Sequence, residues 1–339
     1  MDSSVRGAVY RDFNECYEPI LRCVYDHPEH IVTARGYDSR EVTGSSFTLE
    51  NPQNRFYFSP VRRANIVFNY AEALWYLSGR DDAAYLHYYA PAIGQFTGGR
   101  ERLTGTAYGP RIFGIDGDQP SQWERVADAL REDPQSRRAV IQIFSGSESL
   151  NIGNADVSCT LSLQFLIRDG ALDAITYMRA NDAYRGMVSD VFSFTLLQEI
   201  MAAELGVQVG RYHHHVGSLH IYARDYDMAA QLLDFPITPY NVEFPVVDPR
   251  SNVRADIEIV RKIESQLRSD RQRLGDDDVR GLGLTAYWSD VVRLFECYRR
   301  VKQGEQQDER LVLSLPKALR LALAHRWPRH FPFVDEIAG

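Results

Sequence analysis

The sequence predicts an α/β (α+β) protein whose core, from about residue 30 to 235, holds a mixed central β-sheet flanked by helices. Two observations lead to this prediction. Segments with the alternation of β-strands and segments with apolar residues at helical spacing succeed one another through the core. After Asp234 the chain is interrupted by prolines up to Pro249 and then becomes helical. No internal repeat or linker separates the parts, so we expect one domain over 1–339 with a helical portion at about 236–339, although the length would accommodate two.

Local signals place the elements. Residues 64–79 carry apolar side chains at helical spacing and end at a glycine, which predicts a helix. The Arg-Asp-Gly sequence at 168–170 predicts a tight turn that joins two strands in a hairpin. The remaining predictions are strands at 138–144, 159–167, 172–178 and 213–222, and helices at 122–131, 191–205, 256–273, 287–301 and 317–325.

Composition and charge argue against several classes of protein. The chain has 38 Lys and Arg residues against 46 Asp and Glu residues, a net charge of −8, whereas duplex-DNA-binding proteins usually carry a basic excess. No apolar run approaches the roughly 18 residues of a membrane span, and residues 1–6 lack a signal-peptide core. Four scattered cysteines suit neither a disulfide framework nor a zinc site. We expect a cytoplasmic protein without metal that binds neither nucleic acid nor membranes.

Cys159 stands at the start of a predicted strand, where a thiol is more often a small buried apolar group than a nucleophile. A nucleophilic cysteine needs nearby cations that lower its pKa from about 8.5, because the thiolate is the reactive form. The polar cluster at 179–182, Arg-Ala-Asn-Asp, follows the next strand and offers a cation. By itself this pairing leaves both interpretations of Cys159 open.

Further residues fall in the order and spacing of a known family pattern. The downstream part of the pattern is Cys159, Gln164, Arg179, Asp182, Gly186, Asp190, His220 and Tyr222. The upstream part is Arg40 before Thr43-Gly44, where the pattern has an R-T-G-T-G loop, Glu72 in AEALWYLSG, Tyr108-Gly109, and Asp-Pro-Gln-Ser-Arg-Arg at 133–138. These motifs resemble those of the thymidylate synthase and deoxycytidylate hydroxymethylase family over about residues 30–230. The resemblance implies the thymidylate synthase fold and a homodimer whose sheets pack together; it does not extend to the last hundred residues.

The resemblance also implies covalent catalysis, in which a cysteine thiolate adds to C6 of a pyrimidine nucleotide. C5 then captures the methylene group of 5,10-methylenetetrahydrofolate, the implied cosubstrate. Cys159 would be the nucleophile, Arg179 would stabilise its thiolate, and Tyr108 would line the site. The other carried-over roles are phosphate binding by Arg40, Arg179 and, from the neighbouring subunit, Arg137 and Arg138; sugar binding by His220 and Tyr222; a substrate contact by Gln164; and folate contacts by Asp182 and Gly186.

Some of these residues have a plainer interpretation outside the family context. Arg137 and Arg138 would form a solvated turn before a strand, and His220 and Tyr222 would be packed strand residues. The histidine run at 213–215 could suggest a metal, but neighbouring residues of a strand alternate between its faces, so we expect it to be structural.

Asp190 bears on the choice of base. Thymidylate synthases have an asparagine here, whose amide reads O4 and N3–H of uracil. A carboxylate can instead accept from the amino group of cytosine, and a protonated carboxyl can donate to N3. The resemblance at this position is to the cytidylate hydroxymethylases. Taken alone, Asp190 would be interpreted as the N-cap of the helix predicted from Val191.

Ala180 bears on the choice of sugar. The synthases and the deoxycytidylate enzymes usually carry a serine here, near the phosphate and the sugar. Loss of this hydroxyl could let the nucleotide shift enough to admit a 2′-hydroxyl group. An alanine resembles the CMP 5-hydroxymethylases of nucleoside-antibiotic pathways such as mildiomycin biosynthesis. CMP is therefore the predicted substrate and dCMP the alternative.

Two further differences concern the reaction. Thr160 replaces the histidine that follows the nucleophile in synthases, and the family's W-D-E-W segment is not recognisable at 89–99. A hydroxymethylase must admit water to the exocyclic methylene carbon, and we assign its activation to Glu72, which apolar residues flank. The alternative for Glu72 is an ordinary polar helix residue. We predict a cytidylate 5-hydroxymethyltransferase; a thymidylate synthase and a silent relative that binds nucleotide or RNA are the other possibilities.

Overall fold

The computed structural model describes residues 7–34, 36–91, 99–114, 120–150, 153–154, 156–235, 240 and 242–332. The strands in these ranges are β1 (Ala8–Tyr10), β2 (His30–Ala34), β3 (Tyr37–Leu49), β4 (Val140–Gln142), β5 (Thr160–Arg168), β6 (Ala171–Asp182) and β7 (Gln208–Tyr222). The helices are α1 (Phe13–Asp26), α2 (Ile66–Leu77), α3 (Ala83–Tyr89), α5 (Gly109–Phe113), α6 (Gln122–Glu132), α7 (Gly186–Leu205), α8 (Tyr226–Asp234), α9 (Val253–Arg268), α10 (Asp276–Arg280), α11 (Ala286–Gln303), α12 (Glu309–Leu313) and α13 (Lys317–Arg326).

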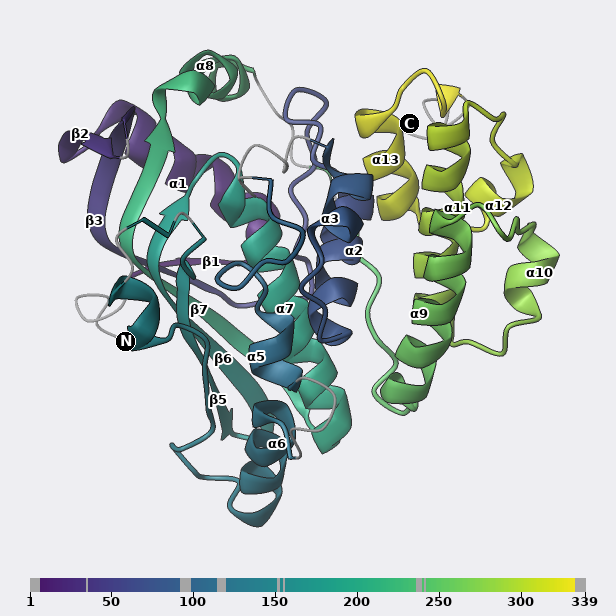
Figure 1. The fold of residues 1–339 in the computed structure, drawn as a ribbon, viewed down its shortest axis with the longest axis horizontal. Coiled ribbons are helices and arrows are strands. Elements are labelled where there is room, and N and C mark those ends of the chain that lie inside the picture. Colours follow the sequence, from purple (N-terminus) through teal and green to yellow (C-terminus); the bar gives the residue numbers. More distant parts are fainter. Residues whose placement is uncertain are drawn as a thin grey trace.

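In the described part of the chain the strands form one seven-stranded sheet in the order β1-β3-β7-β6-β5-β4, with β2 paired to β3 (Figure 1). The β1–β3 and β6–β7 pairs are parallel and the other pairs are antiparallel. The predicted tight turn joins β5 to β6 with positive φ at Asp169 (52°) and Gly170 (78°), as a two-residue type I′ hairpin turn requires. The predicted mixed sheet is confirmed.

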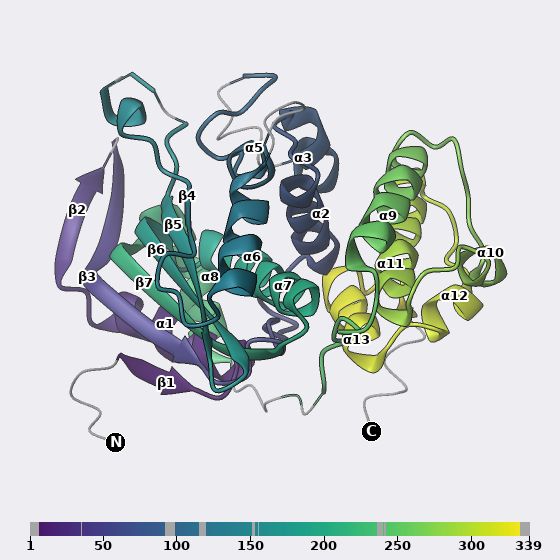
Figure 2. The ribbon, with the colours of Figure 1, turned by 90° about the horizontal axis from the view of Figure 1, so that it is seen from below.

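Helices cover one face of the sheet in successive layers (Figure 2). α7 contacts β6 and β7, and its side chains are buried nearly all round. α2 packs on α7, and α9, α11 and α13 of the C-terminal portion pack on α2. Because α7 and α2 lie in the middle of this stack, they must be apolar on most sides. This explains why their sequences lack a clear polar face.

Hydrogen bonds from tyrosine side chains join the C-terminal helices to the core. The hydroxyl of Tyr89, at the end of α3, donates to Oε1 of Glu264 on α9 at 2.7 Å. The hydroxyl of Tyr298 on α11 donates to the Tyr88 carbonyl at 2.8 Å. The helical character predicted for this part of the chain is confirmed by α9 to α13.

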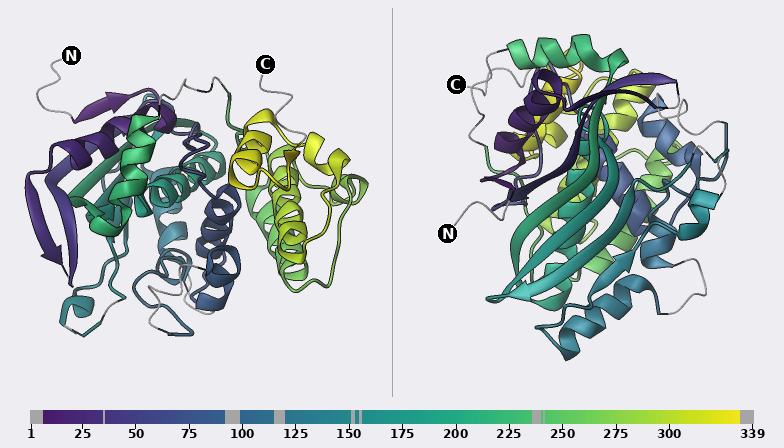
Figure 3. Two further views of the ribbon diagram at one scale, coloured as in Figure 1. Left: turned by 90° about the horizontal axis from the view of Figure 1, so that it is seen from above. Right: turned by 90° about the vertical axis from the view of Figure 1, so that its left-hand side faces the viewer.

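The other face of the sheet is turned to the viewer in the right-hand view of Figure 3, where the strands lie in front of the helices. Tyr177 on β6 and His215 on β7 stack on this face with ring centres 5.3 Å apart. His215 is exposed and Tyr177 half-buried, while their strand neighbours, such as His214, are buried on the side of α7.

One local prediction is wrong. Thr43 and Gly44 were expected in a loop after Arg40, but all three residues lie inside β3, which pairs with β7 along most of its length. Gly44 keeps the extended strand irregular at this point through its φ of +65°. The polar sequence of β3 hid the strand because this segment lacks the alternating apolar pattern.

Candidate active site

Cys159 immediately precedes β5 and is half-buried. By contrast, Cys16 and Cys297 are buried and Cys23 is exposed away from the sheet core. The pairing of β5 with β6 shifts register between Thr160 and the residue two positions on. Such bulges redirect side chains and are common beside active sites, so the strand start at Cys159 is locally adapted to its position.

Arg179 of β6 is held against the backbone around Cys159. Its amide donates to the Cys159 carbonyl at 2.8 Å. Its guanidinium donates through Nε to the Ser158 carbonyl at 2.8 Å and through Nη2 to the Val157 carbonyl at 3.0 Å. Nη2 also lies 3.6 Å from Sγ of Cys159. A cation fixed at this distance favours the thiolate form of the cysteine.

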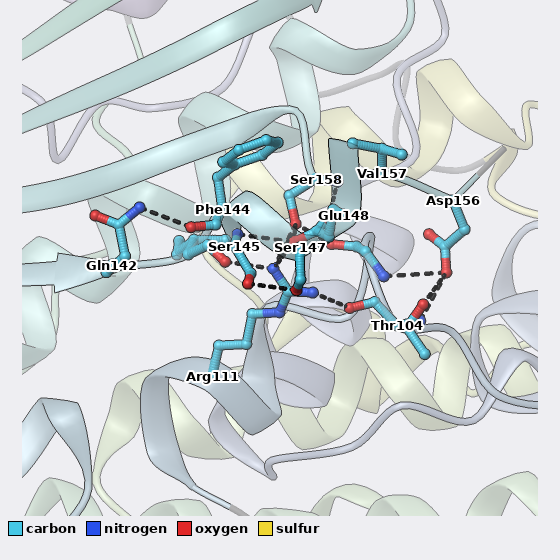
Figure 4. Close-up of polar contacts among 12 residues, drawn as sticks. Thr104, Arg111, Gln142, Phe144, Ser145, Ser147, Glu148, Asp156, Val157 and Ser158 are labelled. Atoms are coloured by element: carbon cyan, nitrogen blue, oxygen red, sulfur yellow. Dashed lines mark hydrogen bonds and ion pairs between the residues drawn. The ribbon is translucent and has the colours of Figure 1, made fainter. Parts of the chain in front are cut away.

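A second arginine holds the loop before Cys159 (Figure 4). Arg111 of α5 donates through Nη1 to Oγ of Ser158 at 2.8 Å and forms an ion pair with Glu148. Glu148 in turn accepts the Ser158 amide at 2.7 Å. Burial acts to raise the pKa of Glu148, but these hydrogen bonds and the charge of Arg111 hold it below its ordinary value. The sequence analysis did not identify either residue.

Asp156 joins the same loop to residues 104–106. Its carboxylate accepts the amides of Thr104 at 2.6 Å, Gly105 at 3.1 Å and Thr106 at 2.7 Å. Burial opposes ionisation, yet these bonds keep the pKa of Asp156 below its usual value. A Cβ atom on Gly105 would lie 2.2 Å from the Asp156 carbonyl oxygen, so the close approach requires glycine.

Tyr108 brings α5 to the thiol. It is buried and stacks on Tyr76 of α2, with ring centres 5.2 Å apart. Burial raises the pKa of Tyr108 well above its ordinary value, and the negative charges of Cys159 and Asp190 raise it further. The same two charges act on Tyr76, which sequence analysis missed because it is one of many apolar residues on α2.

Glu72 lies one turn before Tyr76 on α2 and is only 9% exposed. Burial, followed by the negative charge of Asp190, raises the pKa of Glu72 to about 8. The Ser193 hydroxyl of α7 donates to Oε2 of Glu72 at 3.4 Å. A carboxyl group that titrates near neutral pH suits proton transfer to and from water.

Asp190 lies inside α7, so its interpretation as an N-cap is wrong. The helix already begins at Gly186, with Arg185 as its N-cap and no side-chain capping bond. Oδ1 of Asp182 accepts the amides of Tyr184 and Arg185 at 2.9 Å each in the turn that leads into the helix. Prediction from periodicity placed the start too late because Gly186 and the polar pair Ser189-Asp190 interrupt the apolar pattern of the first turn. Asp190 is therefore free of a capping role.

Asn181 is the direct neighbour of the Asp190 carboxyl group. Its Nδ2 donates to Oδ2 of Asp190 at 2.7 Å. Burial raises the pKa of Asp190 to about 7; the bond from Asn181 opposes this rise and the charge of Asp182 adds to it. A Cβ atom on Gly186 would lie 3.3 Å from both Nδ2 of Asn181 and Oδ2 of Asp190, so the glycine leaves room for this contact.

The residues predicted to bind sugar and folate lie at the neighbouring ends of β6 and β7. The register pairs Asp182 with His220 and Ala180 with Ser218. The rings of His220 and Tyr222 meet edge to face with centres 4.9 Å apart. Oδ1 of Asp182 accepts the amides of Tyr184 and Arg185 in the turn before α7.

The predicted phosphate-binding residues lie in other surroundings. The guanidinium of Arg40 on β3 packs 4.3 Å from the ring centre of Tyr25 and donates to the Tyr25 carbonyl at 2.6 Å. Arg137 and Arg138 are exposed before β4, and Gln164 of β5 donates to the Arg137 carbonyl at 3.0 Å. The contacts described for these residues do not join them to Cys159.

The histidine run occupies three different environments on β7. His213 contacts the Thr48 hydroxyl at 2.9 Å, His214 is buried, and His215 stacks on Tyr177. The described residues contain no group of three His, Cys, Asp or Glu side chains that could hold a metal ion. Of the helices described, none is long and apolar enough to cross a membrane. Most of the 89–99 segment lies outside the described residues.

Comparisons with known proteins show the family and the fold. A family model for thymidylate synthase matches residues 15–253. A deoxyuridylate hydroxymethyltransferase of Bacillus phage SP01 is 32% identical over 222 residues, covering 62% of this chain but only 57% of the relative. The crystal structure of thymidylate synthase from T4 phage is similar in fold, with a TM-score of 0.54 and 20% identity over 66% of this chain and 81% of that chain. The family match ends where α9 begins.

Proposed function

The chain belongs to the thymidylate synthase family, and on this premise we propose that it transfers a hydroxymethyl group to C5 of CMP. The reaction would convert CMP, 5,10-methylenetetrahydrofolate and water into 5-hydroxymethyl-CMP and tetrahydrofolate. The observation that carries the proposal is the grouping of a thiol, a cation and two buried carboxyl groups: Cys159, Arg179, Glu72 and Asp190. This set contains a nucleophile, its stabiliser, a base for water and a group that can read the pyrimidine.

In the first step the Cys159 thiolate adds to C6 of the pyrimidine, which makes C5 nucleophilic. The cosubstrate supplies a one-carbon unit at the oxidation level of formaldehyde. C5 bonds to this carbon, the C5 proton leaves, and tetrahydrofolate departs without being oxidised. Arg179 stays at 3.6 Å from the sulfur and lowers the cost of its negative charge, both before addition and when the C6–S bond breaks.

Water then adds to the exocyclic methylene carbon. Glu72 accepts a proton from this water, and the electrons that return through the ring expel the Cys159 thiolate. The pKa of about 8 at Glu72 matches such a proton acceptor, because a base is most effective when its pKa lies near the working pH. No electron is gained or lost overall, which distinguishes this reaction from methylation by a thymidylate synthase.

Asp190 favours cytosine as the base. Cytosine offers an amino donor beside the N3 acceptor, and a neutral carboxyl offers the complementary acceptor and donor. The pKa of about 7 at Asp190 makes the neutral form accessible at physiological pH. A second candidate is hydroxymethylation of a uracil nucleotide, because the phage SP01 relative carries deoxyuridylate in its name.

The choice of CMP over dCMP depends on Ala180. It is half-buried on β6, where it pairs with Ser218, two residues before His220 on β7. We assign His220 and Tyr222 to the sugar. A methyl group here leaves space that a serine hydroxyl would fill and removes one hydrogen bond near the phosphate. A role in the biosynthesis of a nucleoside antibiotic follows only from the resemblance to the CMP enzymes.

We also propose a homodimer formed through the sheet face in the right-hand view of Figure 3. Arg137 and Arg138 are exposed just before β4, where they can reach a neighbouring subunit's nucleotide phosphate. Bidentate bonds from guanidinium groups to phosphate would then join the two sites.

The direct test is a product assay with CMP, dCMP, dUMP and UMP in parallel, each with 5,10-methylenetetrahydrofolate. The mass of the nucleotide product and the release of tetrahydrofolate or dihydrofolate are read together. We expect 5-hydroxymethyl-CMP with tetrahydrofolate. Product from dCMP alone would keep the mechanism and overturn the assignment of the sugar, and methylated dUMP with dihydrofolate would overturn the reaction type.

A further inference from the structure

A chain of buried hydrogen bonds runs from the Asp190 carboxyl group to Tyr212. Nδ2 of Asn181 donates to Oδ2 of Asp190 at 2.7 Å. Oδ1 of Asn181 lies 3.0 Å from Nε2 of His214, and Nδ1 of His214 lies 2.8 Å from the Tyr212 hydroxyl. Asn181 is 3% exposed and the other two members, His214 and Tyr212, are fully buried. The polar groups of these three side chains are therefore shielded from water and bond to one another.

The first bond determines the direction of the others. The amide nitrogen of Asn181 donates to Asp190, so its amide oxygen faces His214. Nε2 of His214 must then carry the ring proton, and Nδ1 accepts from the Tyr212 hydroxyl. Burial lowers the pKa of His214 to about 3, so the ring is neutral and holds this single tautomer.

Packing prevents the chain from rearranging. Phe47 of β3 stacks on the His214 ring with centres 4.9 Å apart. Gly186 contributes no side chain and lets Asn181 and Asp190 meet, as shown by the 3.3 Å that a Cβ atom would leave to each. Asn181 and His214 lie on the adjacent parallel strands β6 and β7, so the sheet sets their separation.

The symmetry of a carboxyl group makes this chain important for reading a base. A neutral carboxyl can carry its proton on either oxygen, and cytosine and uracil present opposite donor and acceptor patterns at N3 and C4. A carboxyl free to move its proton would therefore satisfy both bases. A donor already bound to Oδ2 disfavours a proton on that oxygen and leaves Oδ1 as the proton carrier.

We propose that Asn181, oriented by His214 and Tyr212, is a positioning residue that fixes the donor and acceptor oxygens of Asp190 and so sets the preference for cytosine over uracil. The proposal rests on the proposed pyrimidine nucleotide substrate. It adds the residue that makes Asp190 select cytosine over uracil. The Asp190 carboxyl accepts from Asn181, and the titratable groups around it are Asp182 of β6, Glu72 and Tyr76 of α2, Tyr108, and Tyr212 of β7. Of these, Asp182 favours its neutral form.

The test compares Asn181→Leu, Tyr212→Phe and, as a matched control, Thr48→Val. Thr48→Val removes a hydrogen bond to His213, the strand neighbour of His214, without touching the chain. For each variant the ratio of kcat/KM for CMP over UMP and the calorimetric Kd of both nucleotides are measured. We expect Asn181→Leu to lower the ratio about tenfold or more, Tyr212→Phe to lower it a few-fold, and Thr48→Val to leave it unchanged.

Each outcome decides the proposal. A loss of CMP turnover with an unchanged CMP-to-UMP ratio in Asn181→Leu would overturn it, because a merely structural residue affects both bases equally. Tyr212→Phe, which removes one oxygen atom, provides the same test if Asn181→Leu does not fold. If the wild-type protein converts neither nucleotide, the proposed function fails, and the ratio of the two Kd values then decides this inference separately: equal ratios in wild type and variants overturn it.

Discussion

The guanidinium of Arg179 lies 3.6 Å from Sγ of Cys159 and is held there by hydrogen bonds to the carbonyl groups that precede this cysteine. The cation is thus anchored to the same backbone that carries the thiol. Movement of the loop would carry both groups together, so their separation is insensitive to small shifts. A cation held in this way favours the thiolate form of a neighbouring cysteine.

Replacement of Arg179 by Gln should slow the reaction of Cys159 with iodoacetamide by about tenfold at neutral pH, because the thiolate loses its neighbouring cation. Mass spectrometry of the modified peptides measures this rate. Cys23 is exposed and supplies an internal reference in the same sample, since its rate should not change. Equal rates for Cys159 in wild type and variant would refute the role of Arg179.

Glu148→Gln should lower kcat more than it changes the Kd for nucleotide, because Glu148 positions the loop before Cys159 without touching the substrate. Loss of the charge that pairs with Arg111 should also reduce the free energy of unfolding by about 1–3 kcal/mol. Steady-state kinetics and urea unfolding check both effects. The control is Asp128→Asn, which breaks an ion pair with Arg131 on the surface of α6. It should change neither kcat nor the free energy of unfolding. If Glu148→Gln keeps the wild-type kcat, the loop that Glu148 holds does not position Cys159 for the reaction.

Glu72→Gln should change how stability depends on pH. The folded protein keeps the Glu72 proton up to about pH 8, whereas the unfolded chain releases it near its ordinary pKa of 4.5. The wild-type free energy of unfolding therefore falls as pH rises between these values, by at most about 1.4 kcal/mol per pH unit. The glutamine variant lacks this loss, so its advantage over wild type should grow up to about pH 8 and then stay constant.

Urea unfolding at several pH values measures this difference between Glu72→Gln and wild type. Glu258→Gln, on the exposed side of α9, serves as the control and should follow the wild-type curve. Parallel curves for wild type and Glu72→Gln would show that Glu72 is ionised like an ordinary surface carboxylate.

Asp190→Asn should admit uracil nucleotides. The amide offers a fixed donor and acceptor that match O4 and N3–H of uracil, while the loss of a titrating carboxyl weakens the match to cytosine. The ratio of kcat/KM for CMP over UMP should fall by at least about tenfold. An unchanged base preference would return Asp190 to a structural role within α7.

Ala180→Ser should shift the preference from CMP toward dCMP. The added hydroxyl fills space near the sugar and supplies one hydrogen bond, which corresponds to a change of a few-fold to about tenfold in the ratio of the two kcat/KM values. Competition between CMP and dCMP in one reaction measures this ratio directly. If the ratio does not move, Ala180 has no part in the choice of sugar.

Sequence patterns predicted the elements whose period is clear and failed where tertiary contacts decide. α2, α6 and β5 were found close to their observed positions, whereas β7 begins five residues before its expected start at His213. α7 was expected to begin at Val191, because the turn before it is fixed by two backbone amides bound to Asp182, which no periodicity reveals. β3 was missed because its pairing with β7, rather than an apolar alternation, makes it a strand.

The site shows the same division. Family spacing identified the groups that would meet the substrate, such as Cys159, Arg179 and Asp190, although they come from separate elements. Sequence patterns did not identify the residues that hold these groups, which are Arg111, Glu148 and Asn181. Their partners lie on other elements of the fold. One signal was present: Asn181 lies between Arg179 and Asp182 in the motif itself.

The central claim is that water, not hydride, completes the reaction on a nucleotide bound to Cys159. The most direct measurement is the reaction of CMP with 5,10-methylenetetrahydrofolate in water enriched in heavy oxygen, followed by the mass of the nucleotide product and the identity of the released folate. We expect a hydroxymethyl product that carries one heavy oxygen atom, together with tetrahydrofolate, and no product from Cys159→Ala. A methylated product without heavy oxygen, released with dihydrofolate, would contradict the account.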